Sequence, residues 1–379
     1  MGCCCKKKPF PVSIVISSEH LIEKNQENST QQKEISIEDF EKLCLIGKGT
    51  FSKVYLVKNK RNQKIFSMKQ LHKSFIKQTN QQQHTITERI LLSQMNNPFL
   101  VKLYCCFQDN ENLYFILEFV PGGELLFHLN RETRFDNEKT RFYVAEMIIA
   151  LNFLHKNKVI YRDLKPENVL IDKDGHIKLT DFGLSKFCET KAFTICGTPY
   201  YIAPEIFNKG GYNDVVDWWS LGCIMYEMLA GKPPFLFDPK KIDLDLYKQP
   251  VQLMNNFTDE AKDLLTKLLD LNPKTRIGAG KNGIKNLQKH KYFDGIDWEE
   301  LEKKNAKAPF VPKLNSETDL KYFDKKFIEE LNSSKESEEN SSTNRTIDNY
   351  LGFSYYDCNA SCLRPKKSIT STQSKEENI

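Results

Sequence analysis

Apolar and polar positions follow three different patterns between residues 37 and 120. Residues 37–57 alternate around a glycine-bearing turn, which predicts a β-hairpin. Residues 84–92, H-T-I-T-E-R-I-L-L, repeat at helical spacing, which predicts a helix with one apolar face. Residues 112–120 begin with an apolar run, which predicts a buried strand that leads into a glycine turn. This part of the chain therefore predicts a small β-rich lobe with one main helix.

Polar segments lie on either side of the patterned region. Residues 17–34 are rich in Ser, Glu, Asn and Gln, and residues 331–345 are rich in Ser, Glu and Asn, so both indicate linkers. With 40% hydrophobic and 28% charged residues, the 379-residue chain suits one large two-lobed domain with polar tails. The longest apolar run, 147–154, is interrupted and predicts a buried helix rather than a membrane span.

Charge and cysteine content narrow the class of protein. The net charge is +5, but Asp and Glu are plentiful, so we expect no nucleic-acid partner. Eleven cysteines without a secretory apolar segment indicate reduced thiols rather than a disulfide framework. We therefore expect a cytoplasmic protein.

The first eight residues, M-G-C-C-C-K-K-K, leave two interpretations open. Acylated cysteines next to a basic cluster would hold the chain at an anionic membrane, because two weak anchors together give stable attachment. The alternative is a disordered, reactive cysteine tail. Acylation of cysteine is favoured over myristoylation of Gly2, because the myristoylation pattern has Ser or Thr where this chain has lysine. The anchor candidates are Cys3, Cys4, Cys5, Lys6, Lys7 and Lys8.

Residues 160–183 contain a candidate magnesium and phosphate site, formed by Asp163, Asn168 and Asp181 with Lys165 between the first two. An Asp beside a nucleophilic hydroxyl can orient it and accept its proton. Asn and Asp supply the hard oxygen ligands that Mg²⁺ prefers. A polar hairpin loop would also explain these residues locally, but it leaves the rest of the chain unexplained.

The hairpin turn is a candidate nucleotide-binding loop. Gly47 and Gly49 let the backbone approach phosphate oxygens, and Val54 could cover an adenine base. A tight hairpin without a ligand is the alternative. The loop comprises Ile46, Gly47, Lys48, Gly49, Thr50, Phe51, Ser52, Lys53 and Val54.

Further candidates follow along the small lobe. Lys69, at strand spacing after the loop, would contact the α and β phosphates, and Glu88 on the predicted helix can pair with it. Glu118 and Val120 fit the backbone edge that would meet adenine. Glu124 opens the next predicted helix and could reach a ribose or a substrate cation.

Residues 40–293 resemble a eukaryotic protein kinase catalytic domain. Y-R-D at 161–163, P-F-L-V-K-L at 98–103 and T-I-C-G-T-P at 194–199 resemble the AGC group, which contains the cyclic-nucleotide-dependent kinases, protein kinase C and protein kinase B. The resemblance implies an α+β, bilobal kinase fold whose carboxy-terminal tail wraps both lobes. The implied segments are a tail at 1–36, a small lobe at 40–118, a helical lobe at 121–293, an AGC-type tail at 294–356 and a disordered end at 357–379.

The resemblance also implies catalytic roles. Asp163 would be the catalytic base, and Lys165 would steady the transferring phosphoryl group of ATP. Asn168 and Asp181 would hold Mg²⁺, and Thr198 would orient the substrate backbone.

An active enzyme is favoured because the catalytic positions are filled, including the implied ion pair of Lys69 with Glu88. Ser52 stands where the family has the third glycine of its loop, so we expect a stiffer loop. That departure mildly favours the second hypothesis, a catalytically weak, membrane-tethered scaffold that binds ATP and partners.

Thr194 lies where the AGC group carries its activating phosphothreonine. Three cations clasping one dianion would order the loop. The cations that the resemblance places there are Arg162, Lys186 and His84. An upstream activating kinase is implied, with autophosphorylation as the alternative.

The carboxy-terminal tail carries three further candidates. Phe323, in Y-F-D-K-K-F, resembles an adenine contact. Tyr350 and Phe353 resemble the hydrophobic motif and would dock beside the helix of Glu88, with Ser354 as a regulatory site. The candidate turn-motif sites are Ser333, Ser334 and Ser337.

Other large-lobe residues look architectural. Glu205 would pair with Arg276, and Asp217 would cap the catalytic-loop backbone. A stacked apolar spine, equally describable as ordinary core, would comprise Leu92, Leu103, Tyr161 and Phe182.

The implied substrates are proteins with basic residues upstream of Ser or Thr, because carboxylates match guanidinium groups. The candidate carboxylates are Glu124, Glu167 and Glu227. Family members usually have Glu where this chain has Tyr200, so the nearby surface could read substrates differently. We expect a monomeric Ser/Thr protein kinase.

Overall fold

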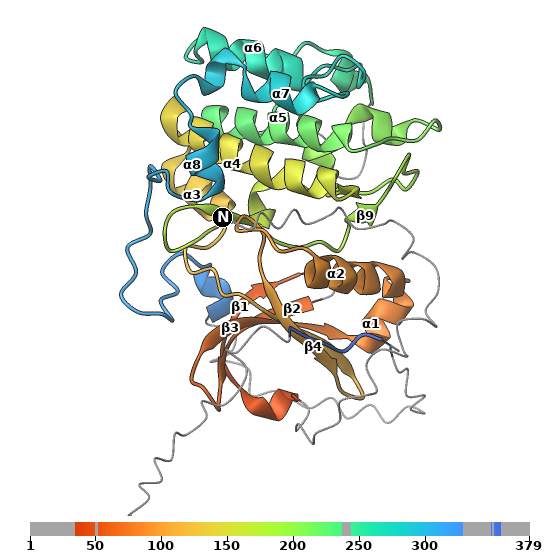
Figure 1. The fold of residues 1–379 in the computed structure, drawn as a ribbon, viewed down its shortest axis with the longest axis vertical. Helices are drawn as coiled ribbons and strands as arrows, with labels where there is room; N and C mark the ends of the chain where they lie inside the picture. Colours follow the sequence, from red (N-terminus) through yellow and green to blue (C-terminus); the bar gives the residue numbers. More distant parts are fainter. Residues whose placement is uncertain (1–34, 50–51, 237–243, 329–349, 351, 358–379) are drawn as a thin grey trace, which may run out of the picture.

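The computed structural model describes residues 35–49, 52–236, 244–328, 350 and 352–357. It has a small lobe built on a sheet and a larger lobe of helices, which is the predicted α+β arrangement (Figure 1). The predictions for the amino-terminal anchor, for Thr50 and Phe51, and for the turn-motif serines lie outside the described residues.

The small lobe contains a six-stranded sheet in the order β1-β2-β3-β5-β4-β10. Its strands are β1 Phe40–Lys48, β2 Ser52–Asn59, β3 Ile65–His72, β4 Leu103–Gln108, β5 Asn112–Leu117 and β10 Tyr355–Tyr356. Leu45 faces Tyr55 across β1 and β2, so the predicted hairpin is confirmed. β10 comes from the far end of the chain and pairs antiparallel with β4.

The main helix of the small lobe is α2, Gln82–Gln94, which buries Glu88, Leu91 and Leu92. This confirms the predicted helix and its inward face. A short helix that the sequence reading did not predict, α1, precedes it at Lys73–Gln78. A short 3₁₀ helix, Ile37–Asp39, leads into β1.

The large lobe consists mainly of helices (Figure 1). They are α3 Leu125–Glu132, α4 Asn137–Lys156, α5 Val215–Ala230, α6 Asp259–Leu268, α7 Gly283–Gln288 and α8 Trp298–Glu302. The Asp136 side chain caps α4 by accepting from the Lys139 amide. α5 ends at Gly231, whose φ of 78° is the left-handed conformation that glycine adopts readily.

Short strands and 3₁₀ helices lie along the segments that connect the helices of the large lobe. The strands pair as β6 Val159–Ile160 with β9 Lys186–Phe187, and β7 Val169–Ile171 with β8 Ile177–Leu179. The 3₁₀ helices of the large lobe are Pro166–Asn168, Pro199–Tyr201, Pro204–Phe207, Leu244–Lys248 and Lys291–Phe293.

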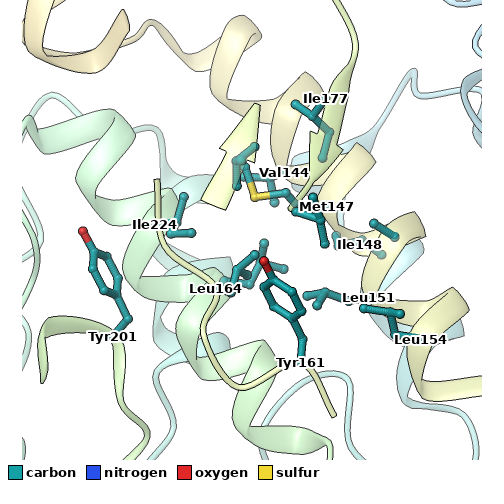
Figure 2. Close-up of a cluster of buried hydrophobic side chains, with 14 of the residues drawn as sticks. Val144, Met147, Ile148, Leu151, Leu154, Tyr161, Leu164, Ile177, Tyr201 and Ile224 are labelled. Atoms are coloured by element: carbon teal, nitrogen blue, oxygen red, sulfur yellow. The ribbon is translucent and has the colours of Figure 1, made fainter. Parts of the chain in front are cut away.

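One apolar core continues from α2 through the catalytic loop into α4 and α5. Figure 2 shows Tyr161 and Leu164 beside Met147, Ile148 and Leu151 of α4. The four predicted spine residues are all buried in this core. The apolar run 147–154 lies within α4, and none of the helices in the described residues has the length and hydropathy needed to cross a membrane.

The carboxy-terminal tail follows α8 and contacts both lobes. Tyr322 packs against His128 of α3, and Phe323 stacks on Phe119 between the lobes. The tail then contributes β10 to the small-lobe sheet. Asp357, one residue beyond the predicted tail, also donates its amide to Tyr104 O at 3.0 Å. The tail therefore connects the large lobe, the region between the lobes and the sheet.

Candidate active site

Three of the predicted site residues surround the buried carboxylate of a fourth, Asp163. Thr198 Oγ1 donates to Asp163 Oδ1 at 2.9 Å, and Lys165 Nζ lies 3.0 Å from Oδ2. Lys165 Nζ also donates to Thr198 Oγ1 at 3.0 Å. Asn168 Nδ2 donates to Asp163 Oδ2 at 2.9 Å and to its carbonyl oxygen at 2.8 Å. These bonds fix the direction in which the carboxylate points.

Asp217, at the start of α5, holds the backbone that precedes Asp163. Its carboxylate accepts the amides of Tyr161 at 3.0 Å and Arg162 at 2.9 Å, so the predicted cap is present. Arg162 has φ 69°, a conformation that a non-glycine residue rarely adopts, and the Asp217 bonds stabilise it. His155 Nε2 adds a third donor to Asp217 at 2.7 Å, which the sequence reading missed.

Lys69 connects the two lobes by ion pairs. Its Nζ lies 2.7 Å from Glu88 Oε1 and 3.2 Å from Asp181 Oδ1. Burial alone would lower the pKa of Lys69, but the carboxylates of Asp181 and Glu88 raise it, so the ammonium stays charged. Lys69 in turn lowers the pKa of Asp181. The Phe182 amide also donates to Glu88, which ties α2 to the Asp-Phe-Gly segment.

The residues predicted to hold Mg²⁺ offer suitable donor atoms. The amide nitrogen of Asn168 is used on Asp163, which leaves its Oδ1 as a ligand atom. The Thr180 amide donates to Asn168 O at 3.0 Å, and this bond brings Asp181 to the same place. A carboxylate and an amide oxygen are ligands that fit Mg²⁺.

The nucleotide side of the site is partly described. Gly49 N donates to Ser52 O at 2.8 Å, and a Cβ on Gly49 would lie 2.9 Å from Ser52 Oγ, so a larger residue here would require the Ser52 side chain to move. The Glu118 side chain pairs with Lys178 at 3.0 Å, and its amide donates to Lys102 O at 2.9 Å, which leaves its carbonyl oxygen for the predicted adenine edge. Phe323 reaches this edge through its stacking on Phe119, 5.7 Å between ring centroids.

The three predicted substrate-reading carboxylates interact with one another. Burial and the charge of Glu167 raise the pKa of Glu124 to about 7. Burial also raises the pKa of Glu227 to about 7, and Glu167 contributes. Tyr201 OH donates to Glu227 Oε2 at 2.6 Å, a partner that the sequence reading missed.

The predicted phosphate clasp around Thr194 is only partly assembled. Thr194 is exposed. Arg162 uses Nε on Leu184 O at 2.6 Å and Nη1 on the hydroxyl of Tyr212 at 3.0 Å. Burial and the charge of Arg162 lower the pKa of His84, so its imidazole lies within electrostatic range of Arg162 and its charged form is disfavoured. Lys186 is positioned by its pairing with Ile160, and within the described residues its side chain forms no hydrogen bond with Arg162 or His84.

The predicted docking of the hydrophobic motif is present. The Phe353 ring is buried and packs edge-on against Phe115, 5.3 Å between centroids. Arg89 of α2 donates to Phe353 O and Ser354 O, each at 3.1 Å. Gln108 donates to Tyr350 O at 3.1 Å. The Ser354 side chain stays exposed.

A pocket of ≈ 620 Å³ lies away from these residues, in the large lobe. Lys267, Lys274 and His290 are among its lining residues, between α6 and α7. None of the predicted catalytic residues lines it, so this pocket is separate from the candidate active site.

Several contacts could not be found from residue type alone. The sequence motifs around Tyr201 and Tyr212 did not indicate a role for either side chain. The hydroxyl partners of these tyrosines come from other segments, whose positions depend on the fold. His155 follows an apolar run and reads as the end of a helix. Only the contact of Arg89 with the tail had a signal in the sequence, because Arg89 directly follows Glu88 on the helix where the tail was predicted to dock.

Comparison with known proteins agrees with the geometry. The protein kinase domain model matches residues 40–293, and the protein kinase C terminal domain model matches residues 314–355. The chain is similar to the RAC serine/threonine-protein kinase of Drosophila melanogaster, with 45% identity over 307 residues, 80% of this chain and 50% of that protein. It is 42% identical over 296 residues to the cAMP-dependent protein kinase catalytic subunit of Dictyostelium discoideum, 78% of this chain and 46% of that protein.

A yeast relative gives the same result. The chain is 43% identical over 305 residues to the serine/threonine-protein kinase YPK1 of Saccharomyces cerevisiae, 79% of this chain and 45% of that protein. The chain thus spans about half the length of these curated relatives.

Proposed function

Because the chain belongs to the protein kinase family, and within it to the AGC group, we propose that it transfers the γ-phosphate of ATP to Ser or Thr of protein substrates. The observation that carries this proposal is the convergence of Lys165, Asn168 and Thr198 on the Asp163 carboxylate. A carboxylate held in this way can orient a substrate hydroxyl and accept its proton.

Charged and polar side chains of the site would bind ATP and stabilise the transferring phosphoryl group. Lys69, held between Glu88 and Asp181, would bind phosphate oxygens of ATP. Lys165 would offset charge on the transferring group beside Asp163. Asn168 and Asp181 would hold Mg²⁺, which offsets phosphate charge when bound. Phe323 and the backbone of Glu118 and Val120 would contact adenine, and Gly47 and Gly49 would lie over the phosphates.

The direct test is Asp163→Asn, which keeps the shape and removes the charge. We expect phosphotransfer to a peptide to fall by a factor on the order of 10² to 10⁴, the usual contribution of a positioned base. Radiolabelled phosphate transfer measures it, with Asp259→Asn, an exposed carboxyl of α6, as the control. Full activity in Asp163→Asn contradicts the proposal.

The membrane-tethered scaffold hypothesis is not favoured, because the catalytic residues are both filled and assembled. It would regain support if the wild-type protein bound ATP and transferred no phosphate.

We further propose that substrates carry basic residues upstream of the target Ser or Thr. The support is the electrostatic coupling of Glu167 to both Glu124 and Glu227, which gathers negative charge in one place. Guanidinium groups match such carboxylates.

Activation is proposed to need phosphate at Thr194 and at Ser354, supplied at Thr194 by an upstream kinase. Both side chains are exposed, and each lies near an arginine, Arg162 or Arg89. Mass spectrometry of the purified protein should find phosphate at both positions.

Membrane contact through Cys3, Cys4 and Cys5 with the adjacent lysines is a separate proposal, supported by the sequence M-G-C-C-C-K-K-K. Changing the three cysteines to Ser should move the protein from the membrane to the soluble fraction. An unchanged membrane fraction would refute the anchor.

A further inference from the structure

We infer that Tyr212 is a positioning residue whose hydroxyl holds the activation segment beside Arg162 before Thr194 carries phosphate. The inference rests on the proposed kinase function. It assigns to the unphosphorylated protein a connection that a phosphate at Thr194 would later duplicate.

Tyr212 lies in the loop between the 3₁₀ helix Pro204–Phe207 and α5, and its side chain is buried. Its backbone forms an antiparallel bridge with Ala192 of the activation segment. Ala192 N donates to Tyr212 O at 2.8 Å, and Tyr212 N donates to Ala192 O at 2.9 Å. The two segments are therefore already paired in the unmodified chain.

The Tyr212 hydroxyl extends this pairing to the catalytic loop. It donates to the backbone oxygen of Thr194 at 2.6 Å and accepts from Arg162 Nη1 at 3.0 Å. Arg162 directly precedes Asp163, and Asp217 holds its amide. One hydroxyl thus connects the phosphorylation site to the residue beside the proposed base.

Contacts on either side of Tyr212 keep the two segments together. Lys191 Nζ donates to Gly210 O at 2.8 Å. A Cβ on Gly211 would lie 2.7 Å from the Phe193 ring, so this ring lies directly over the glycine. Thr194 itself is exposed, and the hydroxyl of Tyr212 uses only its backbone oxygen.

Phosphate and the tyrosine hydroxyl would act on the same guanidinium. Arg162 has Nε on Leu184 O and Nη1 on Tyr212, and its Nη2 makes no hydrogen bond within the described residues. A phosphate at Thr194 could therefore bind Arg162 without displacing Tyr212. The Tyr212 bond should matter most when the phosphate is missing.

The test combines Tyr212→Phe with Thr194→Ala, which removes the phosphate site but keeps the backbone oxygen that Tyr212 uses. In the Thr194→Ala protein, Tyr212→Phe should lower kcat/KM for a basic peptide by about tenfold, the effect of losing one hydrogen bond to a charged group. In the protein phosphorylated at Thr194 the loss should be less than about threefold. A purely structural role would lower both proteins equally, and that result would overturn the inference, as would no loss in the Thr194→Ala protein.

Tyr226→Phe is the matched control, because it also removes a buried tyrosine hydroxyl that donates to a backbone oxygen, Gln252 O at 2.8 Å. Tyr226→Phe should change kcat/KM in neither the Thr194→Ala protein nor the phosphorylated protein.

A second measurement, amide hydrogen exchange, does not depend on activity or on any variant. In dephosphorylated wild-type protein the Ala192 amide should exchange slowly with solvent, and exchange as fast as an exposed amide would refute the inference even if the kinase proposal stands. Absence of phosphotransfer by the wild type would instead reject the kinase proposal.

Discussion

Three glutamates beside the catalytic loop illustrate how burial tunes a charged site. Glu124 is the residue directly before α3, Glu227 lies in α5, and Glu167 lies in the catalytic loop. One oxygen of Glu167 is buried and has no hydrogen-bond partner in the described structure. Repulsion and burial together raise the pKa of Glu124 and of Glu227 to about 7. The positive charge of a basic substrate residue would offset both effects, because it favours the ionised form of each carboxylate.

These pKa values predict a pH dependence for basic substrates. Both groups are mostly ionised at pH 8 and mostly protonated at pH 6, so attraction to guanidinium groups should weaken as pH falls. We expect the ratio of kcat/KM for an arginine-containing peptide to that for a neutral analogue to fall about tenfold over this range. The ratio removes pH effects on steps that both peptides share.

Glu124→Gln should make this pH profile shallower, because the amide does not titrate and only Glu227 then still changes its charge in this range. Glu302→Gln, at an exposed position in α8, should leave it unchanged. A ratio that stays constant with pH in the wild type would count against substrate reading by these carboxylates.

At the scale of single residues, the sequence predicted the site residues that lie close together along the chain. Asp163, Lys165 and Asn168 lie on one tight loop, so their meeting follows from local geometry. Tyr201 and Tyr212 act through hydroxyl contacts with residues from other segments, and residue type alone does not reveal such partners.

At the scale of elements, the tail and α2 form one unit. Arg89 donates to two tail carbonyls from the same helix that presents Glu88 to Lys69. β10 adds its short strand to the edge of β4, where unpaired backbone groups would otherwise face solvent. Tail docking therefore stabilises the position of the Glu88 helix.

Phe353→Ala should release this unit without unfolding the large lobe. The buried ring packs on Phe115, and removing a buried phenylalanine costs about 3–5 kcal/mol. That loss is larger than the stabilisation that the backbone pairing of a two-residue strand supplies, so β10 should separate from β4. We expect faster amide exchange at Cys106, whose amide faces β10 because residues 355 and 106 form a hydrogen-bonded pair, and a lower kcat as Glu88 becomes less well held.

Val311→Ala, at an exposed tail position, is the control and should change neither quantity. Unaltered exchange in Phe353→Ala would mean that the tail docks independently of this ring. The sequence predicted the docking from the order of its aromatic residues, but not Arg89, because the bonds go to backbone oxygens.

At the scale of the molecule, composition and pattern were enough for two lobes and a tail. The sequence did not predict how closely the tail passes between the lobes. A Cβ on Gly122 would lie 2.3 Å from Ile171 O and 2.8 Å from Pro312 Cγ, so tail and large lobe leave no room there. Such contacts depend on packing between segments nearly 200 residues apart along the chain.

A substitution at Gly123 tests whether the close packing of the tail against residues 122–123 supports nucleotide binding. Its φ is 73°, and a Cβ would lie 2.2 Å from Tyr322 O, next to the Phe323 ring that stacks on Phe119. Gly123→Ala should push the tail away and raise the KM for ATP about tenfold, since overpacking costs ~1–3 kcal/mol. Gly280→Ala is the matched control, because Gly280 has a φ of 74° but open space around its Cβ. Both variants carry the same backbone strain, so an equal rise in KM would attribute the effect to strain, whereas a rise in Gly123→Ala alone would attribute it to the tail.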